Sequence, residues 1–217
     1  MAQMNSTVEQ TIDCIVNHAA SKKRCDQSLS VAITGIDGSG KSFLSEVLFS
    51  RLSEAGLSCA ILKLDLWHQP SYIRFAKNNP GENYYLNAYK FNDFFSLLVE
   101  PLKKSRAIDI KVELFDAYSD YQYTKSFLFE NIDVILLDGI FLLKKEFRKH
   151  HDYSIWIECS FSTAWARALS RNQEKTSEDQ IKYLYNFIYF PAQRIHLYRD
   201  TPLKFADQII YNKWPNE

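Results

Sequence analysis

Residues 35–42 read GIDGSGKS and match the pattern GxxxxGK[ST] at every position. Glycines allow a backbone to curl so that successive N–H groups point at phosphate oxygens. The segment lies between a buried apolar run and an amphipathic run, where the start of a helix would add its partial positive charge. We therefore predict a phosphate-binding loop whose nucleotide-binding residues are Gly35, Asp37, Gly38, Ser39, Gly40, Lys41, Ser42 and Phe43.

Two oxygen-bearing side chains beside this loop suit a magnesium ion. The lysine of the pattern reaches the β- and γ-phosphates, which makes Lys41 a predicted catalytic residue, and the hydroxyl of Ser42 can bind Mg²⁺. Asp138 ends the apolar run VILLD, and a carboxylate at the carboxyl end of a parallel strand faces the ligand crevice. Ser42 and Asp138 are therefore the predicted metal ligands.

A second carboxylate, Asp65, ends another apolar run in KLDLWHQP (63–70). Phosphoryl transfer to a hydroxyl needs a carboxylate that orients the hydroxyl and accepts its proton. Asp65 would lie at the same edge of the sheet as Asp138, so we predict that it is this base. An aspartate that closes a strand is also an ordinary turn residue, and this simpler reading stays open.

Two arginines share one face of a predicted helix. Arg167 and Arg171 lie four residues apart in FSTAWARALSRNQEK (161–175), and Trp165 and Leu169 point the other way. A basic helix face is often merely solvated. This helix, however, follows the strand after Asp138, in the order where small kinases place an arginine-bearing lid. Arginines there would neutralise charge on the transferred phosphoryl group, so both are predicted catalytic residues.

The elements that must position these residues alternate between short apolar strands and helices, which predicts a parallel sheet covered on both faces. Strands are expected at 31–36, 59–67, 110–115, 134–139, 154–159 and 207–212. Helices are expected at 7–20, around 44–52, around 91–98 with a disturbance at Pro101, from 161, and in pieces over 178–200 with a break near Pro191. Residues 68–87 show no clear period and are expected to form a long functional loop.

Composition limits the partners. The chain has 217 residues, with 26 basic and 26 acidic side chains and a formal net charge of zero, so no global field attracts nucleic acid or an anionic membrane. The longest apolar stretch, 134–143, is interrupted by Asp138 and is too short to span a membrane. No targeting segment is evident at the start, and the four cysteines have no metal-ligand spacing. We therefore expect a soluble cytoplasmic protein that binds neither nucleic acid nor membrane.

Five segments together resemble the uridine kinase-like branch of the P-loop kinases, which includes uridine/cytidine kinase and phosphoribulokinase. They are GIDGSGKS (35–42), LDLWHQP (64–70), NPGENYYLNAYKFNDF (79–94), VILLDGIFLL (134–143) and YFPAQRIHLYRDTPLKFADQIIYN (189–212). The resemblance implies a P-loop NTPase fold, a three-layer α/β/α structure with a five-stranded, mostly parallel sheet and a helical lid. It covers roughly residues 29–212, so we expect a kinase domain at 29–217 preceded by an N-terminal helix and connector at 1–28.

The resemblance also implies an activity and its residues. It makes the chain an ATP-dependent small-molecule kinase that uses ATP and Mg²⁺, with Asp65 as the base for the acceptor hydroxyl. His68 falls where family members contact the acceptor, Tyr84 and Tyr85 align with tyrosines near the acceptor pocket, and Trp67 is assigned to the same pocket. The expected partners are ATP and a small-molecule acceptor. Dimers or tetramers occur among relatives, so a homo-oligomer is one expectation.

The chain departs from uridine kinases at two places. The Tyr-Asp-Phe segment and its following histidine are replaced by FDAYSD (115–120), and the segment between Arg171 and Ser177 contains Lys175 but no third arginine. The identity of the acceptor therefore stays open. Two other functions also stay open: a kinase fold that binds nucleotide with little transferase activity, and a GTPase-type switch. The nearest match to the guanine-reading NKxD motif, Asn212-Lys213-Trp214-Pro215, lacks the aspartate.

Overall fold

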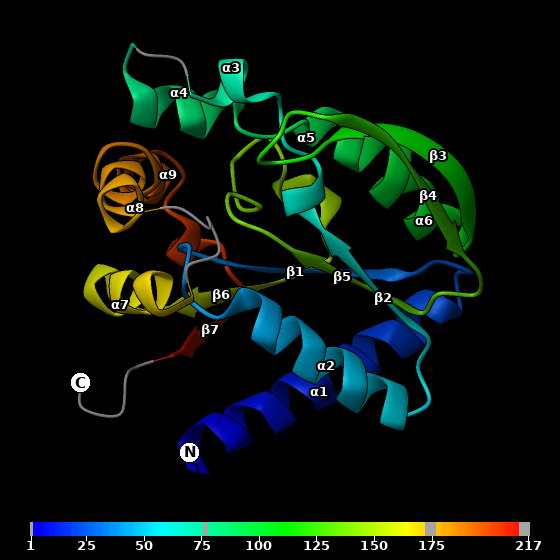
Figure 1. The fold of residues 1–217 in the computed structure, drawn as a ribbon. Coiled ribbons are helices and arrows are strands. Elements are labelled where there is room, and N and C mark those ends of the chain that lie inside the picture. The colour runs from blue at the N-terminus through cyan, green and yellow to red at the C-terminus, as the bar shows by residue number, and fades with distance from the viewer. Residues whose placement is uncertain (1, 76–77, 172–176, 213–217) are drawn as a thin grey trace.

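The central element is a five-stranded sheet in the order β2-β5-β1-β6-β7 (Figure 1). In the computed structural model of the chain, the described residues are 2–75, 78–171 and 177–212. Every pairing in this sheet is parallel, which confirms the predicted α/β class. The strands are β1 Leu29–Gly35, β2 Cys59–Lys63, β5 Val134–Asp138, β6 Tyr153–Glu158 and β7 Gln208–Tyr211.

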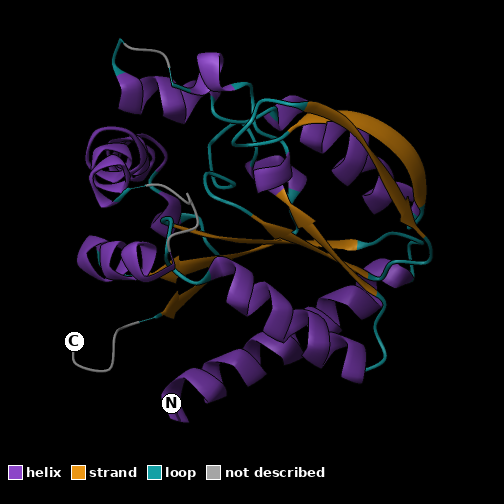
Figure 2. Cartoon of the chain, viewed as in Figure 1, coloured by secondary structure: helices purple, strands orange, loops and turns teal. Residues whose placement is uncertain are grey.

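Helices cover both faces of the sheet, so the fold has three layers (Figure 2). Figure 1 shows α1 and α2 on one side, with the remaining helices on the other side and at the edges. Strands β1 and β5 are buried along their whole length, as strands packed on both faces should be. The helices are α1 Ala2–Lys23, α2 Lys41–Glu54, α3 Ser71–Arg74, α4 Pro80–Asn87, α5 Phe91–Asp93, α6 Glu100–Ser105, α7 Phe161–Arg171, α8 Glu178–Leu184 and α9 Phe190–Asp200.

Helix α1 is longer than the predicted helix 7–20 and packs closely on the sheet layer. Val8, Ile12, Ile15 and Ala19 recur at helical spacing and are buried in one apolar cluster with α2, β1 and β6. At its C-terminal end, Lys22 pairs with Asp152 at 2.7 Å and Lys23 pairs with Asp133 at 3.1 Å. Apolar burial and these two ion pairs therefore hold α1 to the body, and the predicted boundary at residue 28 stays a prediction. No helix in the described ranges is long and apolar enough to cross a membrane.

Two predicted strands differ from the structure. The strand expected at 59–67 ends at Lys63, because its neighbour β5 ends opposite it at Asp138, and Leu64–Leu66 turn into a 3₁₀-helix. The strand expected at 110–115 is β3 Ile108–Phe115, which lies outside the main sheet and pairs with a strand that was not predicted, β4 Gln122–Phe129. Side chains on one face of β4 are exposed, and on the other face only Phe127 is buried, so the strand gives a weak apolar signal.

The predicted long loop at 68–87 contains two helices, α3 and α4, which are too short to show a period in the sequence. Helix α4 starts with Pro80 at its first position, where proline is tolerated because that N–H has no intrahelical partner. It buries Tyr84 and Tyr85 against α9 and the neighbouring core. Tertiary packing, rather than local pattern, therefore forms this helix.

Two long helical stretches continue through a proline, Pro101 in one and Pro191 in the other. A proline in a helix lacks an N–H and clashes with the carbonyl four residues earlier. Here the π-helical segments Phe94–Val99 and Tyr185–Tyr189 lie just before Pro101 and Pro191 and widen the turn. The predicted break near Pro191 is therefore wrong: residues 178–200 remain helical throughout.

Candidate active site

The GIDGSGKS segment joins the end of β1 to the start of α2, so its backbone curls around the N-terminus of a 14-residue helix. The first N–H groups of a helix have no intrahelical acceptor and are suited to bind an anion. Gly40 precedes the helix with φ of 100°, a left-handed conformation that favours glycine. A Cβ at this position would also lie 2.6 Å from Nδ2 of Asn212. The loop therefore needs glycine here for both conformation and space.

The polar groups inside the loop fit a polyphosphate. Lys41 is 8% exposed, and its Nζ donates a hydrogen bond to the carbonyl oxygen of Ile36 at 2.9 Å. The hydroxyl of Ser39 is buried and has no hydrogen-bond partner among the described residues. A buried hydroxyl without a partner is costly, and a phosphate oxygen would satisfy it. The residues present therefore match the ligand that the sequence pattern predicts.

Asp138 lies at the end of β5, opposite Ile33 of β1 and Lys63 of β2, and is 5% exposed. Burial raises the pKa of the Asp138 carboxyl, and the nearby carboxylate of Asp65 raises it further. Lys41 and a hydrogen bond with the Ser42 side chain act in the opposite direction. The two predicted metal ligands are thus adjacent oxygen donors of the kind that Mg²⁺ prefers, so they fit this ion.

The two predicted lid arginines lie on α7 and contact the loop in different ways. Arg167 donates to the carbonyl oxygens of Gly38 at 3.3 Å and Ser39 at 3.5 Å, and to Oδ1 of Asn212 at 3.2 Å. Arg171 is about half exposed and pairs with Asp37 at 3.6 Å. Arg167 therefore supports the loop through its backbone carbonyl groups, whereas Arg171 contacts the loop through the side chain of Asp37, at the solvent-exposed rim of the loop. Lys175 of the predicted lid falls outside the described residues.

Residues that the sequence analysis did not assign also hold the loop. Tyr185 donates a hydrogen bond to the Asp37 carboxylate, and the Asp37 N–H donates to Oε1 of Gln193 at 3.2 Å. Asn212 donates from Nδ2 to the Ser39 carbonyl at 2.7 Å. Gln193 lies in the Pro-Ala-Gln-Arg segment and Asn212 begins the NKxD-like stretch, so both carried a sequence signal. Tyr185 carried none.

Asp65 lies in the 3₁₀-helix Leu64–Leu66, just beyond the end of β2. The hydroxyl of Tyr89 donates a hydrogen bond to Oδ1 of Asp65 at 3.0 Å. Tyr84, which is 5% exposed, is hydrogen-bonded through its side chain to Tyr89. The structure thus links the predicted base to one of the predicted acceptor tyrosines through Tyr89, which the sequence analysis missed.

His68 and Arg74 lie beside this group. The His68 ring stacks on Tyr89 with ring centroids 4.7 Å apart, and burial lowers the pKa of His68 to about 4, so the imidazole is neutral at neutral pH. Arg74 is 3% exposed and donates to the Ala117 carbonyl at 2.6 Å, which ties α3 to the turn between β3 and β4. Its charge contributes to lowering the pKa of His68, so Arg74 is near the predicted acceptor region.

The structure does not bring Trp67 and Tyr85 to this group. Trp67 is 2% exposed and packs against Phe94 and Phe127 in the core. The Tyr85 hydroxyl donates to Asp200 at 2.7 Å, on another side of α4 from Tyr84. Adjacent helix residues point about 100° apart, so only one of the two tyrosines can face Asp65. The acceptor roles of Trp67 and Tyr85 therefore have no support in this geometry.

A cavity of about 230 Å³ lies next to the loop, between α1, α2 and β7. Phe43, which is 66% exposed, lines it together with Gly40, Asn212 and Val8. The wall is largely apolar and meets the phosphate-binding loop at Gly40. An apolar wall that meets this loop can accommodate the apolar part of a ligand whose phosphates bind the loop.

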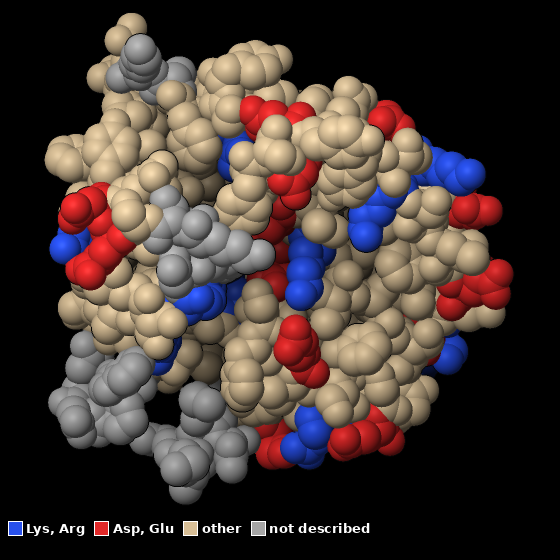
Figure 3. All heavy atoms as spheres, in the orientation of Figure 1, with Lys and Arg blue, Asp and Glu red and all other residues tan. Residues whose placement is uncertain are grey.

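Charges of both signs are interspersed on the face shown in Figure 3, with acidic side chains in the middle and basic ones beside them. The described residues contain no group of three or more His, Cys, Asp or Glu side chains that could hold a metal without a ligand's help.

Comparison with known proteins agrees with this arrangement. The model of the phosphoribulokinase / uridine kinase family matches residues 30–189. A uridine kinase of Staphylococcus haemolyticus is 25% identical over 183 residues, covering 83% of this chain and 86% of that protein. A uridine kinase of Clostridium botulinum is 26% identical over 189 residues, with 83% and 86% covered.

Solved structures share the fold. A possible uridine kinase from Bacillus stearothermophilus superposes with a TM-score of 0.67 at 22% identity, covering 85% of this chain and 89% of that one. A D-glycerate 3-kinase from Cryptococcus neoformans superposes with a TM-score of 0.62 at 13% identity, covering 85% and 86%. At these identities the likeness establishes the fold alone.

Proposed function

The chain belongs to the phosphoribulokinase / uridine kinase family, and from this premise we propose that it is a small-molecule kinase. It would transfer the γ-phosphoryl group of MgATP to a hydroxyl of a nucleoside or a similar small polar metabolite. One observation supports this most directly: the phosphate-binding loop, Asp138 and Asp65 converge at one edge of the sheet. Asp138 is hydrogen-bonded to Ser42 and is close enough to Asp65 for that carboxylate to raise its pKa.

In this proposal the loop and α2 bind the phosphates. Backbone N–H groups of residues 37–42 and the Lys41 ammonium hold the β- and γ-phosphates, and the buried Ser39 hydroxyl gains the partner that the described residues do not provide. Ser42 and Asp138 would hold Mg²⁺, which supplies positive charge to the phosphate oxygens. The cavity lined by Phe43 and Asn212 is the proposed place of the nucleobase.

Asp65 would act on the acceptor. As the acceptor oxygen forms its bond to the γ-phosphorus, the bond from that phosphorus to the β,γ-bridging oxygen breaks, and ADP leaves with the bonding electrons. The hydroxyl proton passes to the Asp65 carboxylate. Arg171 would offset the charge on the phosphoryl group from the loop's rim, and Arg167 would keep the loop in place.

The neighbours of Asp65 support a polar acceptor. The imidazole of His68, which is neutral, and the phenol of Tyr84 are close enough to Asp65 to be affected by its charge, and the guanidinium of Arg74 is close to both of them. Such groups suit a molecule rich in hydroxyls or carbonyls, as a nucleoside or a sugar is. The comparisons with uridine kinases favour a nucleoside, and FDAYSD (115–120) without a histidine favours testing other acceptors as well.

The decisive experiment is a screen of nucleosides, sugars, sugar acids and vitamins with ATP and Mg²⁺, in which the product is detected as a mass increase of one phosphoryl group. Asp65→Asn measured on the same panel tests the base and should reduce turnover by about 100-fold or more. ATP consumption that no acceptor stimulates would favour a nucleotide-binding protein without transferase activity. Tighter binding of GTP than of ATP would favour the switch, because Asn212 already contacts the loop.

A further inference from the structure

Asp65 sits on a short turn that does not by itself fix the orientation of the carboxylate. Strand pairing ends at Lys63, which is opposite Asp138, and the 3₁₀-helix that carries Asp65 is three residues long. A general base must keep one oxygen within about 3 Å of the proton that it removes. Something outside the turn therefore has to hold the side chain.

Tyr89 is anchored well enough to do this. It is 6% exposed, and residues 67–69 and 88–90 are joined by two backbone hydrogen bonds, Lys90 N–H to Trp67 at 2.8 Å and Gln69 N–H to Ala88 at 3.0 Å. An isolated β-bridge pairs Tyr89 with His68, and their rings stack at 4.7 Å. The position of the Tyr89 hydroxyl is thus set by both backbone and ring contacts.

We propose that Tyr89 is a positioning residue of the kinase, whose hydroxyl holds Oδ1 of Asp65 so that Oδ2 faces the acceptor. This inference rests on the proposed function, because it assigns a role within the same phosphoryl transfer. The hydrogen bond at 3.0 Å occupies Oδ1, and among the described residues Oδ2 has no donor. One oxygen is therefore fixed and the other is available for a hydroxyl proton.

The protonation of Tyr89 suits this role. Burial raises the pKa of the Tyr89 phenol well above its ordinary value, and the adjacent Asp65 carboxylate raises it further. Tyr89 therefore stays a donor throughout the cycle and does not compete for the proton that Asp65 accepts. The side chain of Tyr84 is hydrogen-bonded to Tyr89, and its ring packs against the rings of Phe75 and Tyr189.

The test is a double-mutant cycle in the full-length protein. Tyr89→Phe removes only the hydroxyl, Asp65→Asn removes the base, and the double variant carries both. Tyr153→Phe is the control, because it also removes a tyrosine hydroxyl with an acceptor, Gln208 at 3.1 Å, but at the opposite end of β6 from the site. With the best acceptor from the screen, kcat and both KM values are measured for every variant.

We expect Tyr89→Phe to lower kcat about 10-fold with the KM for ATP changed less than about twofold, and Tyr153→Phe to leave kcat unchanged. In the Asp65→Asn background, Tyr89→Phe should cause no further loss. The inference is overturned if Tyr89→Phe keeps the wild-type kcat, or if it reduces turnover by the same factor with and without the carboxylate, because the hydroxyl would then act independently of Asp65.

Urea unfolding of wild type, Tyr89→Phe, Asp65→Ala and the corresponding double variant separates this inference from the proposed function; alanine is used here because the amide oxygen of asparagine could still accept from the Tyr89 hydroxyl. If the hydrogen bond exists, the effects of the two substitutions on the unfolding equilibrium constant differ from additivity by several-fold. Additive effects would overturn the inference whatever the activity. If the wild-type protein phosphorylates no acceptor while the coupling is present, the kinase proposal fails, and with it the role in catalysis, but the contact stands.

Discussion

The ammonium of Lys41 and the carbonyl oxygen of Ile36 are 2.9 Å apart, so the cation of the phosphate-binding loop is oriented by the backbone of the same loop. A lysine ammonium has three donors, and this carbonyl takes one of them. The remaining donors are held in a side chain that is only 8% exposed. The loop therefore presents its charge in a fixed direction, which reduces the entropy lost when a polyphosphate binds.

We predict that Lys41→Met lowers turnover by at least about 100-fold, because the substitution removes the charge on the β- and γ-phosphates. The KM for ATP should rise as well. Acceptor-dependent product formation, measured over a range of ATP concentrations, checks this. Lys182→Met is a suitable control, since Lys182 lies on α8 and pairs there with Glu178 at 2.8 Å. Equal activity of Lys41→Met and wild type would exclude the loop as the phosphate site.

The sequence predicted the parts of this site that follow from local pattern. The loop, the strand that ends at Asp138 and the helix that carries Arg167 and Arg171 are all in their predicted elements, because a glycine-rich turn between a buried strand and a helix is a local property. The alternation of short apolar strands with helices is also visible in the sequence, and the parallel pairing of the main sheet agrees with the class that it predicted.

Contacts between distant segments were not predictable in this way. Tyr89 meets Asp65 only because residues 67–69 and 88–90 pair, and these residues lie at the two ends of what the sequence indicated to be a loop. Tyr84 and Tyr85 are equivalent in the sequence, and only the packing of α4 decides which one faces the site. Strand β4 was missed because one face of it is exposed and its sequence alternates weakly.

Asp138→Asn should separate stability from activity. Burial raises the pKa of Asp138, so the folded protein pays for keeping this carboxylate charged at neutral pH, and the neutral amide removes that cost. At about pH 7.5 and without ligand, we expect the variant to melt at the same temperature as wild type or up to about 2–4 °C higher. Turnover should fall by at least about 100-fold, and Mg²⁺ with ADP should no longer stabilise the protein.

The pH dependence has a definite sign. A carboxyl whose pKa is raised on folding binds protons more readily in the folded state, so the wild-type protein gains stability at this group as the pH falls through the folded pKa. The stability difference between Asp138→Asn and wild type should therefore shrink from about pH 7.5 to about pH 5 in thermal unfolding. A variant that is less stable than wild type at both pH values would contradict the burial argument.

Gly40→Ala and Gly56→Ala offer a comparison of two left-handed glycines. Gly40 has φ of 100°, and a Cβ built there would lie 2.6 Å from Nδ2 of Asn212. Gly56 has φ of 83°, and a Cβ built there would have no neighbouring atom within 4 Å. Both variants lose about 1 kcal/mol to backbone strain. Only Gly40→Ala should also lose nucleotide binding, because it displaces Asn212 from the loop. Isothermal titration with ADP and Mg²⁺ measures this, and equal affinity in the two variants would refute it.

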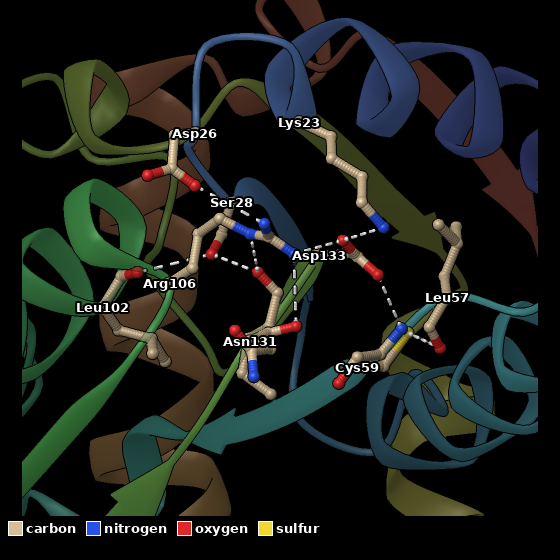
Figure 4. A network of polar contacts seen from close by, with 11 residues as sticks. Lys23, Asp26, Ser28, Leu57, Cys59, Leu102, Arg106, Asn131 and Asp133 are labelled. Atoms are coloured by element: carbon tan, nitrogen blue, oxygen red, sulfur yellow. Dashed lines mark hydrogen bonds and ion pairs between the residues drawn. The ribbon is translucent and has the colours of Figure 1, made fainter.

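Asp133 lies just before β5, at the end of the strands opposite to the phosphate-binding loop, and there it joins four segments of the chain (Figure 4). It is 4% exposed, accepts from Ser58 N–H at 3.0 Å and pairs with Arg106 at 2.6 Å and with Lys23 of α1 at 3.1 Å. Burial alone would raise the pKa of Asp133, but the Ser58 hydrogen bond, Lys23 and Arg106 outweigh it and hold the pKa below its ordinary value.

We therefore predict that Asp133→Asn lowers the free energy of unfolding by about 3 kcal/mol at neutral pH, because the substitution leaves two cations without their shared carboxylate. Since the folded pKa is lowered, the stabilisation is fully present above the ordinary value of 3.8 and is lost as the pH falls through the folded value. Urea unfolding at about pH 7 and about pH 3 should show a smaller difference between wild type and variant at the lower pH than at the higher.

Asp26→Asn is the matched control for this substitution, since Asp26 lies 3.6 Å from the same Arg106 but is 91% exposed. Exposed ion pairs contribute at most about 1 kcal/mol, so this variant should be close to wild type at both pH values. If Asp133→Asn and Asp26→Asn behaved alike, the network would be a surface feature. A loss confined to Asp133→Asn would show that this buried carboxylate stabilises the junction of Lys23, Ser58 and Arg106, far from the phosphate-binding loop.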